Sequence, residues 1–488
     1  MTMLCLTLEN GATSCLQEQL RVALLETIRL NAIPTDEALP SCRKLSKQLG
    51  ISRNTVAIVY EGLVEDGYLV SRPRSGYYLH ENYHQEGLAL EEIPHQTKLE
   101  APSWSKRFTH RPSNYQGVLK PSNWMEYDYP FIYGQLDTQL FPLEQWRDVN
   151  RRLLSGRSDK HWLGDRIDQD DPLLIEQLRK RVLPKRGIFA RSDEILITMG
   201  SQNALFLIAQ LLLHSETRIG LENPGYREAV NVFARQGAKL QLHGIDNQGI
   251  LLNENSKACD YLYVMPSHQV PTGITMSHTR REELIAQIQA HDQIVIEDDY
   301  DAEMHGDQFA LPALKASRAG QRVIYMSSFS KALSPGLRLG YIVADSELVE
   351  ELRALRRMMY RHPPSGLQHQ MAQFFSQGHY ERYLRFYTDD TQRRRERLGK
   401  ALERELEGCR RINGSQASAF WLEAPNSLDT QHLAWQAAQL GVLIEPGFQH
   451  FFNQAPPRNF LRLGFGAIDC ERIDSGISRL AQAFDRVA

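Results

Sequence analysis

The chain has few cysteines, no long apolar run and no excess of one charge. Its six cysteines are scattered over 488 residues without a CxxC pair, which excludes a disulfide framework or a zinc finger and fits a reducing cytosol. The longest apolar stretch, residues 204–213, is shorter than the roughly 20 residues that cross a bilayer, and the N-terminus lacks the pattern of a secretory signal. Lys and Arg total 56 against 59 Asp and Glu, so no global basic field indicates nucleic acid. We predict a cytoplasmic protein of several domains that binds no membrane and no metal.

Composition divides the chain into three parts. Residues 14–80 carry short helical patterns and end in a Gly- and Tyr-rich stretch, whereas residues 81–125 have little periodicity and contain four prolines. We interpret the second part as a linker, whose ends as a flexible coil would lie on the order of 35–40 Å apart. Residues 126–488 alternate short apolar runs with helical segments, which is typical of an α/β domain with a buried, mostly parallel sheet.

The first part contains the pattern of a helix-turn-helix. Ser41 is a good N-cap for a basic helix that ends at Gly50, and Ser52 caps a second helix over residues 53–63. Two short helices joined by a tight, Gly-containing turn form the motif that reads DNA in many regulators.

Local charge supports an interaction with DNA. Between residues 41 and 60, the stretch that ends before Glu61, the charged residues are all basic, and a local cationic patch suffices to bind phosphates. The second helix presents Arg53 and Thr55 from its first turn, where recognition helices contact bases. Residues 71–78 predict a hairpin, or wing. The alternative is a small helical dimerisation module with solvated bases.

Residues 39–79 resemble the winged helix-turn-helix of the GntR family of bacterial transcription regulators. The resemblance covers the pattern LPSxRxL…LGxSRxTV…GY, present here as LPSCRKL…LGISRNTV…GY. It implies binding to a double-stranded DNA operator, with the wing along a minor groove. The residues that it assigns to DNA contact are Arg43, Arg53, Thr55, Arg72, Arg74 and Gly76.

A reactive lysine is predicted in the third part. Lys331 follows an apolar strand within SSFSK, among Ser328 and Ser330, and precedes a Pro-Gly turn and Arg338. Carbonyl chemistry needs an amine that is neutral near pH 7, and desolvation beside cations lowers the pKa of a lysine. The hydroxyls and the guanidinium suit a phosphate monoester.

Acidic residues follow another apolar strand, at the sheet edge where α/β proteins bind ligands. Asp298 and Tyr300 are two residues apart and project to the same side of an extended segment. They could pair with the ring nitrogen and the ring oxygen O3′ of pyridoxal phosphate, respectively. The alternative is a solvated acidic loop.

Three further motifs fit the same ligand. Ser201 and Gln202 open an apolar helix whose free N–H groups could bind a phosphate. Tyr226 could stack on a ring. Arg462 lies in an apolar strand, where a buried cation needs a carboxylate, either internal or from a ligand.

In this order, the motifs resemble fold-type I pyridoxal-phosphate enzymes, the aspartate aminotransferase class. The resemblance implies a smaller C-terminal α+β subdomain from about residue 375. It assigns the cofactor Schiff base to Lys331 and the carboxylate of an amino acid to Arg462. It assigns cofactor binding to Asp298, Tyr300, Ser328, Ser330, Arg338, Ser201, Gln202 and Tyr226.

The whole chain resembles the MocR subfamily, which joins a GntR head to an aminotransferase-like body, and residues 265–273 are similar to its TPSHQxPxG. Two segments depart from the pattern. Val270 stands where aminotransferases place an Asn that helps to hold O3′. Residues 161–175 lack the Tyr-containing stretch whose tyrosine reaches the phosphate of the partner subunit in the family.

The resemblance implies a regulator that senses an amino acid, an amine or pyridoxal phosphate itself through aldimine chemistry at Lys331. The alternatives are an active aminotransferase and a dimerisation scaffold without cofactor. A helix-turn-helix with its wing is of no use to a metabolic enzyme, and the conjunction of Lys331, Asp298 and Arg338 argues against a scaffold. Arg462 favours an effector with a carboxylate, although a sulfonate would bind it as well. The family also implies a homodimer, and a linker of this length permits a head to pack on the partner's body.

Overall fold

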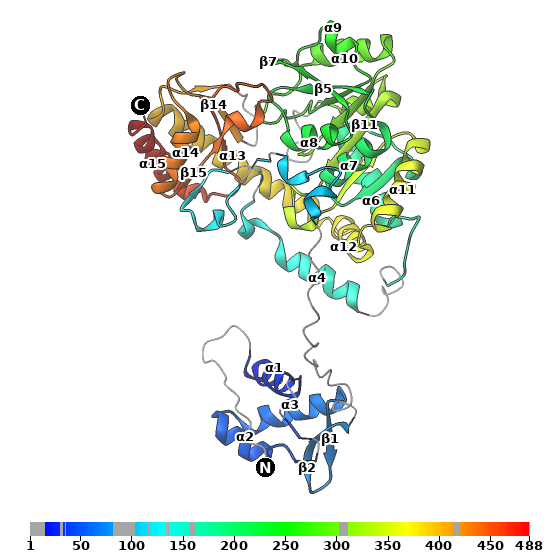
Figure 1. Ribbon diagram of the computed structural model, residues 1–488, viewed down its shortest axis with the longest axis vertical. Coiled ribbons are helices and arrows are strands. Elements are labelled where there is room, and N and C mark those ends of the chain that lie inside the picture. The colour runs from blue at the N-terminus through cyan, green and yellow to red at the C-terminus, as the bar shows by residue number, and fades with distance from the viewer. Residues whose placement is uncertain are drawn as a thin grey trace. The chain divides into compact units, whose positions relative to one another are not determined.

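The computed structural model describes residues 15–29, 33–34, 36–81, 103–115, 117–118, 120–132, 134, 136–155, 163–301, 311–412 and 419–487. The chain divides into two compact units, residues 1–110 and 111–488 (Figure 1). In the described part, no helix is both long and apolar enough to cross a membrane.

The first unit is a three-helix bundle with a two-stranded antiparallel hairpin. Its elements are α1 (Leu16–Arg29), α2 (Cys42–Leu49), α3 (Arg53–Glu65), β1 (Leu69–Arg72) and β2 (Gly76–Leu79). Apolar residues at helical spacing, such as Leu20 and Leu24 of α1, pack against Val56 and Leu63 of α3 in one core.

The predicted helix starts of this unit and the stop at Gly50 are confirmed, whereas α3 runs to Glu65, two residues beyond the predicted end. The Ser41 hydroxyl accepts a hydrogen bond from the Lys44 N–H, and α2 ends at Gly50 in the left-handed conformation with φ 67°. The Ser52 hydroxyl accepts from the Thr55 N–H at 3.0 Å, at the start of α3. The hairpin matches the predicted wing, with Arg74 at its tip.

The second unit is built on a seven-stranded sheet of order β4-β12-β11-β10-β9-β5-β6. All strands run parallel except β12, which is antiparallel to both of its neighbours. The strands in chain order are β4 (Ile195–Thr198), β5 (Arg218–Glu222), β6 (Lys239–His243), β9 (Tyr261–Val264), β10 (Ile294–Asp298), β11 (Val323–Ser328) and β12 (Gly340–Val343). The apolar runs predicted as strands form β4, β9, β10 and β11.

Helices cover both faces of this sheet, which is why its strands are apolar at successive positions. Ile296 packs with Leu205 of α7, whereas its neighbour Val295 packs with Leu284 of α10 in a separate core. The helices of this part are α4 (Leu143–Leu154), α6 (Pro172–Gln177), α7 (Ser201–Leu212), α8 (Arg227–Arg235), α9 (Glu254–Lys257), α10 (His278–Ala290), α11 (Ser346–Tyr360) and α12 (Ser365–Ser376). A short hairpin, β7 (Ile245–Asp246) and β8 (Gly249–Ile250), precedes α9.

The C-terminal part of this unit forms a second layer with its own core. A four-stranded sheet of order β13-β14-β17-β16 packs with helices α13, α14 and α15 (Figure 1). The elements are α13 (His379–Glu405), β13 (Arg410–Arg411), β14 (Ala419–Glu423), α14 (Thr430–Gln439), β15 (Val442–Leu443), β16 (Glu445–Pro446), β17 (Phe460–Gly464) and α15 (Ile473–Asp485). The short strand β3 (Tyr129–Pro130) pairs with β15, so the start of the unit returns to its C-terminal part.

Candidate functional site

The predicted site residues meet at the carboxyl ends of the parallel strands. Asp298 ends β10 beside Met326 of β11, and Ser328 ends β11 beside Gly340 of β12. Gly340 in turn pairs with Thr198, three residues before the start of α7. This register brings the turns after β4, β10 and β11 to one edge of the sheet, where ligands bind in α/β folds.

Lys331 is held where its amine is destabilised as a cation. A Cβ built on Gly134 would lie 2.1 Å from the Lys331 Nζ, and the φ of 77° at this position is one that other residues adopt only with strain. Burial, together with the charges of Lys120 and Arg462, lowers the pKa of Lys331 to about 7. An amine of this pKa is neutral often enough near pH 7 to act as a nucleophile.

Asp298 has a buried carboxylate oxygen that could accept a hydrogen bond from a ligand. Its Oδ2 accepts a hydrogen bond from the Tyr263 hydroxyl at 2.6 Å. Its Oδ1 is buried and has no hydrogen-bond partner among the described residues. Burial, with the charges of Asp299 and Asp301, raises the pKa of Asp298 to about 7.

The neighbouring acids of β10 serve the fold instead. Glu297 accepts hydrogen bonds from the backbone N–H groups of Leu314 and Lys315. Asp299 forms a buried ion pair with Arg186 at 2.8 Å. The acidic run is therefore not a solvated loop. Its outer members bond within the fold, and the Oδ1 of its middle residue, Asp298, accepts no hydrogen bond from the described residues.

The turn before α7 and the turn after β11 face each other. Arg338 donates to the Met199 carbonyl at 3.3 Å, and a Cβ on Gly200 would lie 3.0 Å from the Arg338 Nη2. Ser201 begins α7, and the Ser330 hydroxyl is buried without a hydrogen-bond partner in the described part of the chain. Backbone N–H groups, hydroxyls and a guanidinium thus converge as phosphate binding requires.

Two aromatic residues complete this edge. The Tyr226 hydroxyl donates to the side-chain carbonyl of Gln202 at 3.2 Å. Tyr300 is buried in the same apolar core as Val270, so the valine that departs from the aminotransferase pattern packs as an ordinary core residue.

Arg462, on β17, has an internal carboxylate as its partner. Its Nη1 lies 3.6 Å from Oε1 of Glu445, which also receives His450 Nε2 at 2.8 Å. Burial alone would raise the pKa of Glu445, but His450 and Arg462 lower it to about 2. The charge of Arg462 is one of the causes that lower the pKa of Lys331. Sequence patterns missed Glu445, Tyr263 and Lys120 because none of them belongs to a motif.

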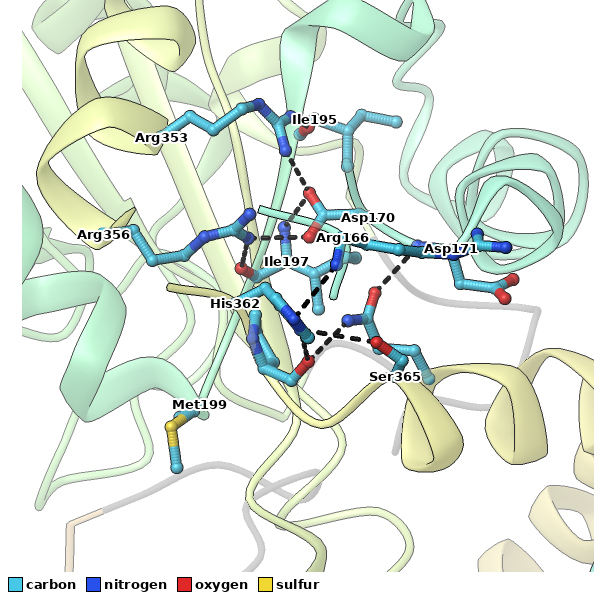
Figure 2. Close-up of polar contacts among 12 residues, drawn as sticks. Arg166, Asp170, Asp171, Ile195, Ile197, Met199, Arg353, Arg356, His362 and Ser365 are labelled. Carbon is cyan, nitrogen blue, oxygen red and sulfur yellow. Dashed lines mark hydrogen bonds and ion pairs between the residues drawn. The ribbon is translucent and has the colours of Figure 1, made fainter. Parts of the chain in front are cut away.

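The segment that departs from the subfamily pattern has a structural role (Figure 2). Residues 161 and 162 lie outside the described residues; in the remainder, Asp170 accepts hydrogen bonds from Arg353 and Arg356, each at 2.7 Å, and from the Ile197 N–H. Arg356 also donates to the Ile197 carbonyl. This buried network ties α11 to β4, the strand that leads into the turn before α7.

The residues predicted to contact DNA lie on the surface of the first unit. Arg43, Arg53, Arg72 and Arg74 are exposed, on α2, at the start of α3 and on the hairpin. The Arg72 guanidinium stacks over the Tyr78 ring at 4.3 Å, a contact between the two strands near the tip of the wing. Thr55 is half-buried, and its hydroxyl hydrogen-bonds that of the N-cap Ser52. Gly76 opens β2 with φ 122°.

Comparison with known proteins assigns each unit to a family. The family described as aminotransferase class I and II matches residues 132–480, and the family described as bacterial regulatory proteins, gntR family, matches residues 16–79. The chain is 38% identical over 476 residues to the HTH-type transcriptional regulator TauR of Rhodobacter capsulatus, covering 98% of both chains. It is 28% identical to the probable rhizopine catabolism regulatory protein MocR of Rhizobium meliloti, over 98% of this chain and 96% of the relative.

A solved structure supports the assignment of the second unit. LysN, the α-aminoadipate aminotransferase of Thermus thermophilus, was solved in complex with N-(5′-phosphopyridoxyl)-L-leucine. It matches with a TM-score of 0.69 and 28% identity, over 79% of this chain and 99% of LysN.

Proposed function

We propose that this chain, which belongs to the MocR-type branch of the GntR family of DNA-binding transcription regulators, senses an amino acid, an amine or pyridoxal phosphate at the site around Lys331. Its second unit has the fold-type I aminotransferase fold, as predicted. The observation that carries the proposal is the lysine of lowered pKa at the same sheet edge as the open carboxylate oxygen of Asp298.

The residues present fit pyridoxal phosphate. The open Oδ1 of buried Asp298 suits a ring N–H, and the open hydroxyl of Ser330 suits a phosphate oxygen. The residues that would hold the cofactor are Asp298, Tyr300, Ser328, Ser330, Arg338, Ser201, Gln202 and Tyr226. When bound, this cofactor supplies an electrophilic carbon that amines attack and a ring that withdraws electrons.

The chain's own residues prepare the site for an amine. Lys331, neutral in part near pH 7, is the residue that would hold the cofactor through its amine. Arg462, which also contacts Glu445, would bind the acid group of the effector. Whether the Lys331 amine is held by the cofactor or is free to carry a proton changes the local charge at the centre of the unit.

Sensing requires that this local change alters DNA binding. An effector biases DNA affinity only through unequal affinity for two states of the protein. We expect a homodimer, in which two winged heads bind two half-sites of an operator and the effector changes how the heads are held. The bounds 14–80, 81–125 and 126–488 for head, linker and body remain predictions.

The test is an absorbance spectrum of the purified protein with added pyridoxal phosphate, repeated for Lys331→Ala and for Lys400→Ala as a surface control. We expect a visible band of lysine-bound cofactor in the wild type and the control, and its loss in Lys331→Ala. Titration with amino acids should shift the band and change operator affinity in the same concentration range. If no band forms, the sensing part of the proposal is wrong and the DNA-binding part stands alone.

The second candidate is an active aminotransferase, favoured by the joint presence of Lys331, Asp298 and Arg462 at one site. The same titration separates the two functions. A band shift that settles without keto-acid product supports a sensor, whereas steady production of keto acid supports an enzyme.

A further inference from the structure

The hydroxyl of Tyr263 donates a hydrogen bond to the Asp298 carboxylate from the neighbouring strand. Tyr263 of β9 pairs with Ile296 of β10, and Asp298 follows two residues later on the same face of the sheet. The donor and acceptor oxygens are 2.6 Å apart, and both side chains are buried. The Tyr263 ring also packs edge-on against Phe233 of α8, with the ring centroids 5.6 Å apart. Packing and register together therefore hold the phenol in place against Oδ2 of Asp298.

The opposite face of the sheet carries a second pair of this kind. Tyr325 of β11 pairs with Glu297, and its hydroxyl donates at 2.9 Å to Asp299, two residues farther along the chain. Asp299 also forms a buried ion pair with Arg186 at 2.8 Å, so the fold itself compensates its charge. Asp298 forms no ion pair with a described residue, and its Oδ1 accepts no hydrogen bond from one. The two pairs thus have similar geometry but differ in the cation.

The Tyr263 hydroxyl favours the ionised form of Asp298, because a donor stabilises the charged form of an acid. Burial and the charge of Asp298 raise the pKa of Tyr263 well above its ordinary value of 10, so the hydroxyl keeps its proton and stays a donor. Burial raises the pKa of Asp298 to about 7, and the charges of Asp299 and Asp301 act in the same direction. The Tyr263 hydrogen bond and the charge of Lys331 act against them.

We propose that Tyr263 is a positioning residue that acts through Asp298: its hydroxyl holds Oδ2 of the ionised carboxylate, and Oδ1 then receives a protonated ring nitrogen of the ligand. This inference rests on the proposed function, because it takes the ligand ring to be that of pyridoxal phosphate.

The hydrogen-bonding capacity of the carboxylate identifies the group at Oδ1. An ionised carboxylate only accepts hydrogen bonds, whereas a neutral carboxyl can also donate one. With Tyr263 on Oδ2, the ligand atom at Oδ1 has to be a donor, and a protonated ring nitrogen supplies the positive charge that Asp298 lacks. A ring with C–H in place of the nitrogen offers neither the donor nor the charge. Tyr263 therefore makes the site prefer the nitrogen ring over an otherwise identical carbocycle.

The experiment measures this preference by calorimetric titration of the cofactor-free full chain with pyridoxal phosphate and with its deaza analogue, in which a C–H replaces the ring nitrogen. The ratio of the two affinities cancels any effect of a variant on the free protein, the aldehyde or the phosphate. The titrations are run at pH 6, below the pKa of about 7 of Asp298, so that the carboxyl beside a ring carbon holds its proton.

The variants are Tyr263→Phe, Asp298→Asn and the two combined. Tyr325→Phe is the matched control, because it removes the same hydroxyl from the aspartate pair on the opposite face. Tyr263→Phe removes one oxygen and keeps the ring that packs on Phe233. Circular dichroism should show that every variant folds.

We expect Tyr263→Phe to lower the preference for pyridoxal phosphate over the deaza analogue about tenfold, the value of a lost hydrogen bond to a charged group. Tyr325→Phe should keep the wild-type preference. Asp298→Asn alone should lose most of it, because an amide carries no charge. In that background, Tyr263→Phe should have little further effect, as expected for two residues that act as one unit.

Three results would overturn the proposal while leaving cofactor binding intact. One is an equal preference in Tyr263→Phe and Tyr325→Phe. Another is a loss of the same size from Tyr263→Phe with and without Asp298→Asn, since the phenol would then act by another route. The third is a preference that Asp298→Asn retains, which decides the matter even if Tyr263→Phe fails to fold. If the wild type binds neither ligand, the proposed function itself fails, and the role of Tyr263 falls with it.

Discussion

In the N-terminal unit, the arginines at 43, 53, 72 and 74 are exposed on the helix-turn-helix and its hairpin, where water solvates them and dissolved ions screen their charge. In the second unit, Arg356 and Arg462 are buried beside Asp170 and Glu445, and Lys331 lies among other cations. Exposed charge acts over distances of about 8 Å at physiological ionic strength and is screened by salt. Buried charge acts at contact distance and depends on every partner around it.

This difference matches the two tasks. DNA presents a repeating array of phosphates, which an exposed cationic surface can bind without precise geometry. A small effector presents one or two polar groups, which need preorganised partners in a site that excludes water. The comparison predicts that single charge changes affect stability in the body and binding in the head.

The largest effect is expected at the buried network of Figure 2. Asp170→Ala leaves the buried Arg356 and the partly buried Arg353 without their shared carboxylate, and should lower the free energy of unfolding by about 3–5 kcal/mol. Urea denaturation of the full chain measures this loss. The control is Asp66→Asn in the head, whose ion pair with Arg21 is exposed and contributes about 0–1 kcal/mol. Equal losses in both variants would contradict the comparison.

At the DNA interface, Arg53→Ala should weaken specific operator binding by about 1–3 kcal/mol without changing the stability of the chain. The guanidinium is exposed in the first turn of α3, so no buried partner loses a contact. Fluorescence anisotropy with labelled operator at several salt concentrations measures the affinity and its salt dependence. Arg479→Ala, exposed on α15, is the control; an operator affinity insensitive to salt would refute the helix-turn-helix assignment.

The pH dependence of stability should differ between the units. Burial raises the pKa of Glu222 from its ordinary 4.5 to about 8. The folded state therefore holds this proton more tightly than the unfolded state, and the stabilisation is lost as pH rises from about 4.5 through 8. The free energy of unfolding of the wild type, measured with urea, should therefore fall relative to that of Glu222→Gln between pH 6 and pH 8.5. For Glu61→Gln, a change at an exposed position on α3, the difference in unfolding free energy from wild type should not vary with pH in this way. If the difference for Glu222→Gln is also constant with pH, the raised pKa of Glu222 is refuted.

The smallest expected effect is at the cap of the recognition helix. Ser52→Ala removes the hydroxyl that accepts from the Thr55 N–H and should cost about 1 kcal/mol of unfolding free energy. Ser71→Ala, exposed on β1, should change stability by less than about 0.5 kcal/mol. Thermal unfolding followed by circular dichroism compares the two, and a Ser52 variant as stable as the Ser71 variant would exclude a role for the cap.

Local features were predicted well because they depend on neighbours in sequence. Ser41, Gly50 and Ser52 mark helix ends through bonds that span three or four residues, and the pattern alone predicts them. The apolar runs of the central sheet were predicted as strands for the same reason. Lys331 and Asp298 could be predicted as site residues since each follows such a strand directly.

The remaining features depend on contacts between distant segments. Lys120 had no motif and lay in a stretch of little periodicity, so sequence composition assigned it to a linker. Glu445 and Tyr263 likewise became visible only through their bonds to His450 and Asp298. The sequence left open whether the carboxylate partner of Arg462 is internal or belongs to a ligand, and the fold supplies an internal one, Glu445.

The sequence by itself determined the helix-turn-helix, the strands of the main sheet and the lysine and aspartate at their ends, because hydrophobic periodicity and capping are local. Tertiary structure alone decided which charges meet. In the folded chain the amines of Lys120 and Lys331 both lie near Gly134, Glu445 lies beside Arg462, and Asp170 lies between two arginines. Burial then lowered the pKa of Lys120 and of Lys331, since the cost of a buried charge depends on the partners that the fold places around it.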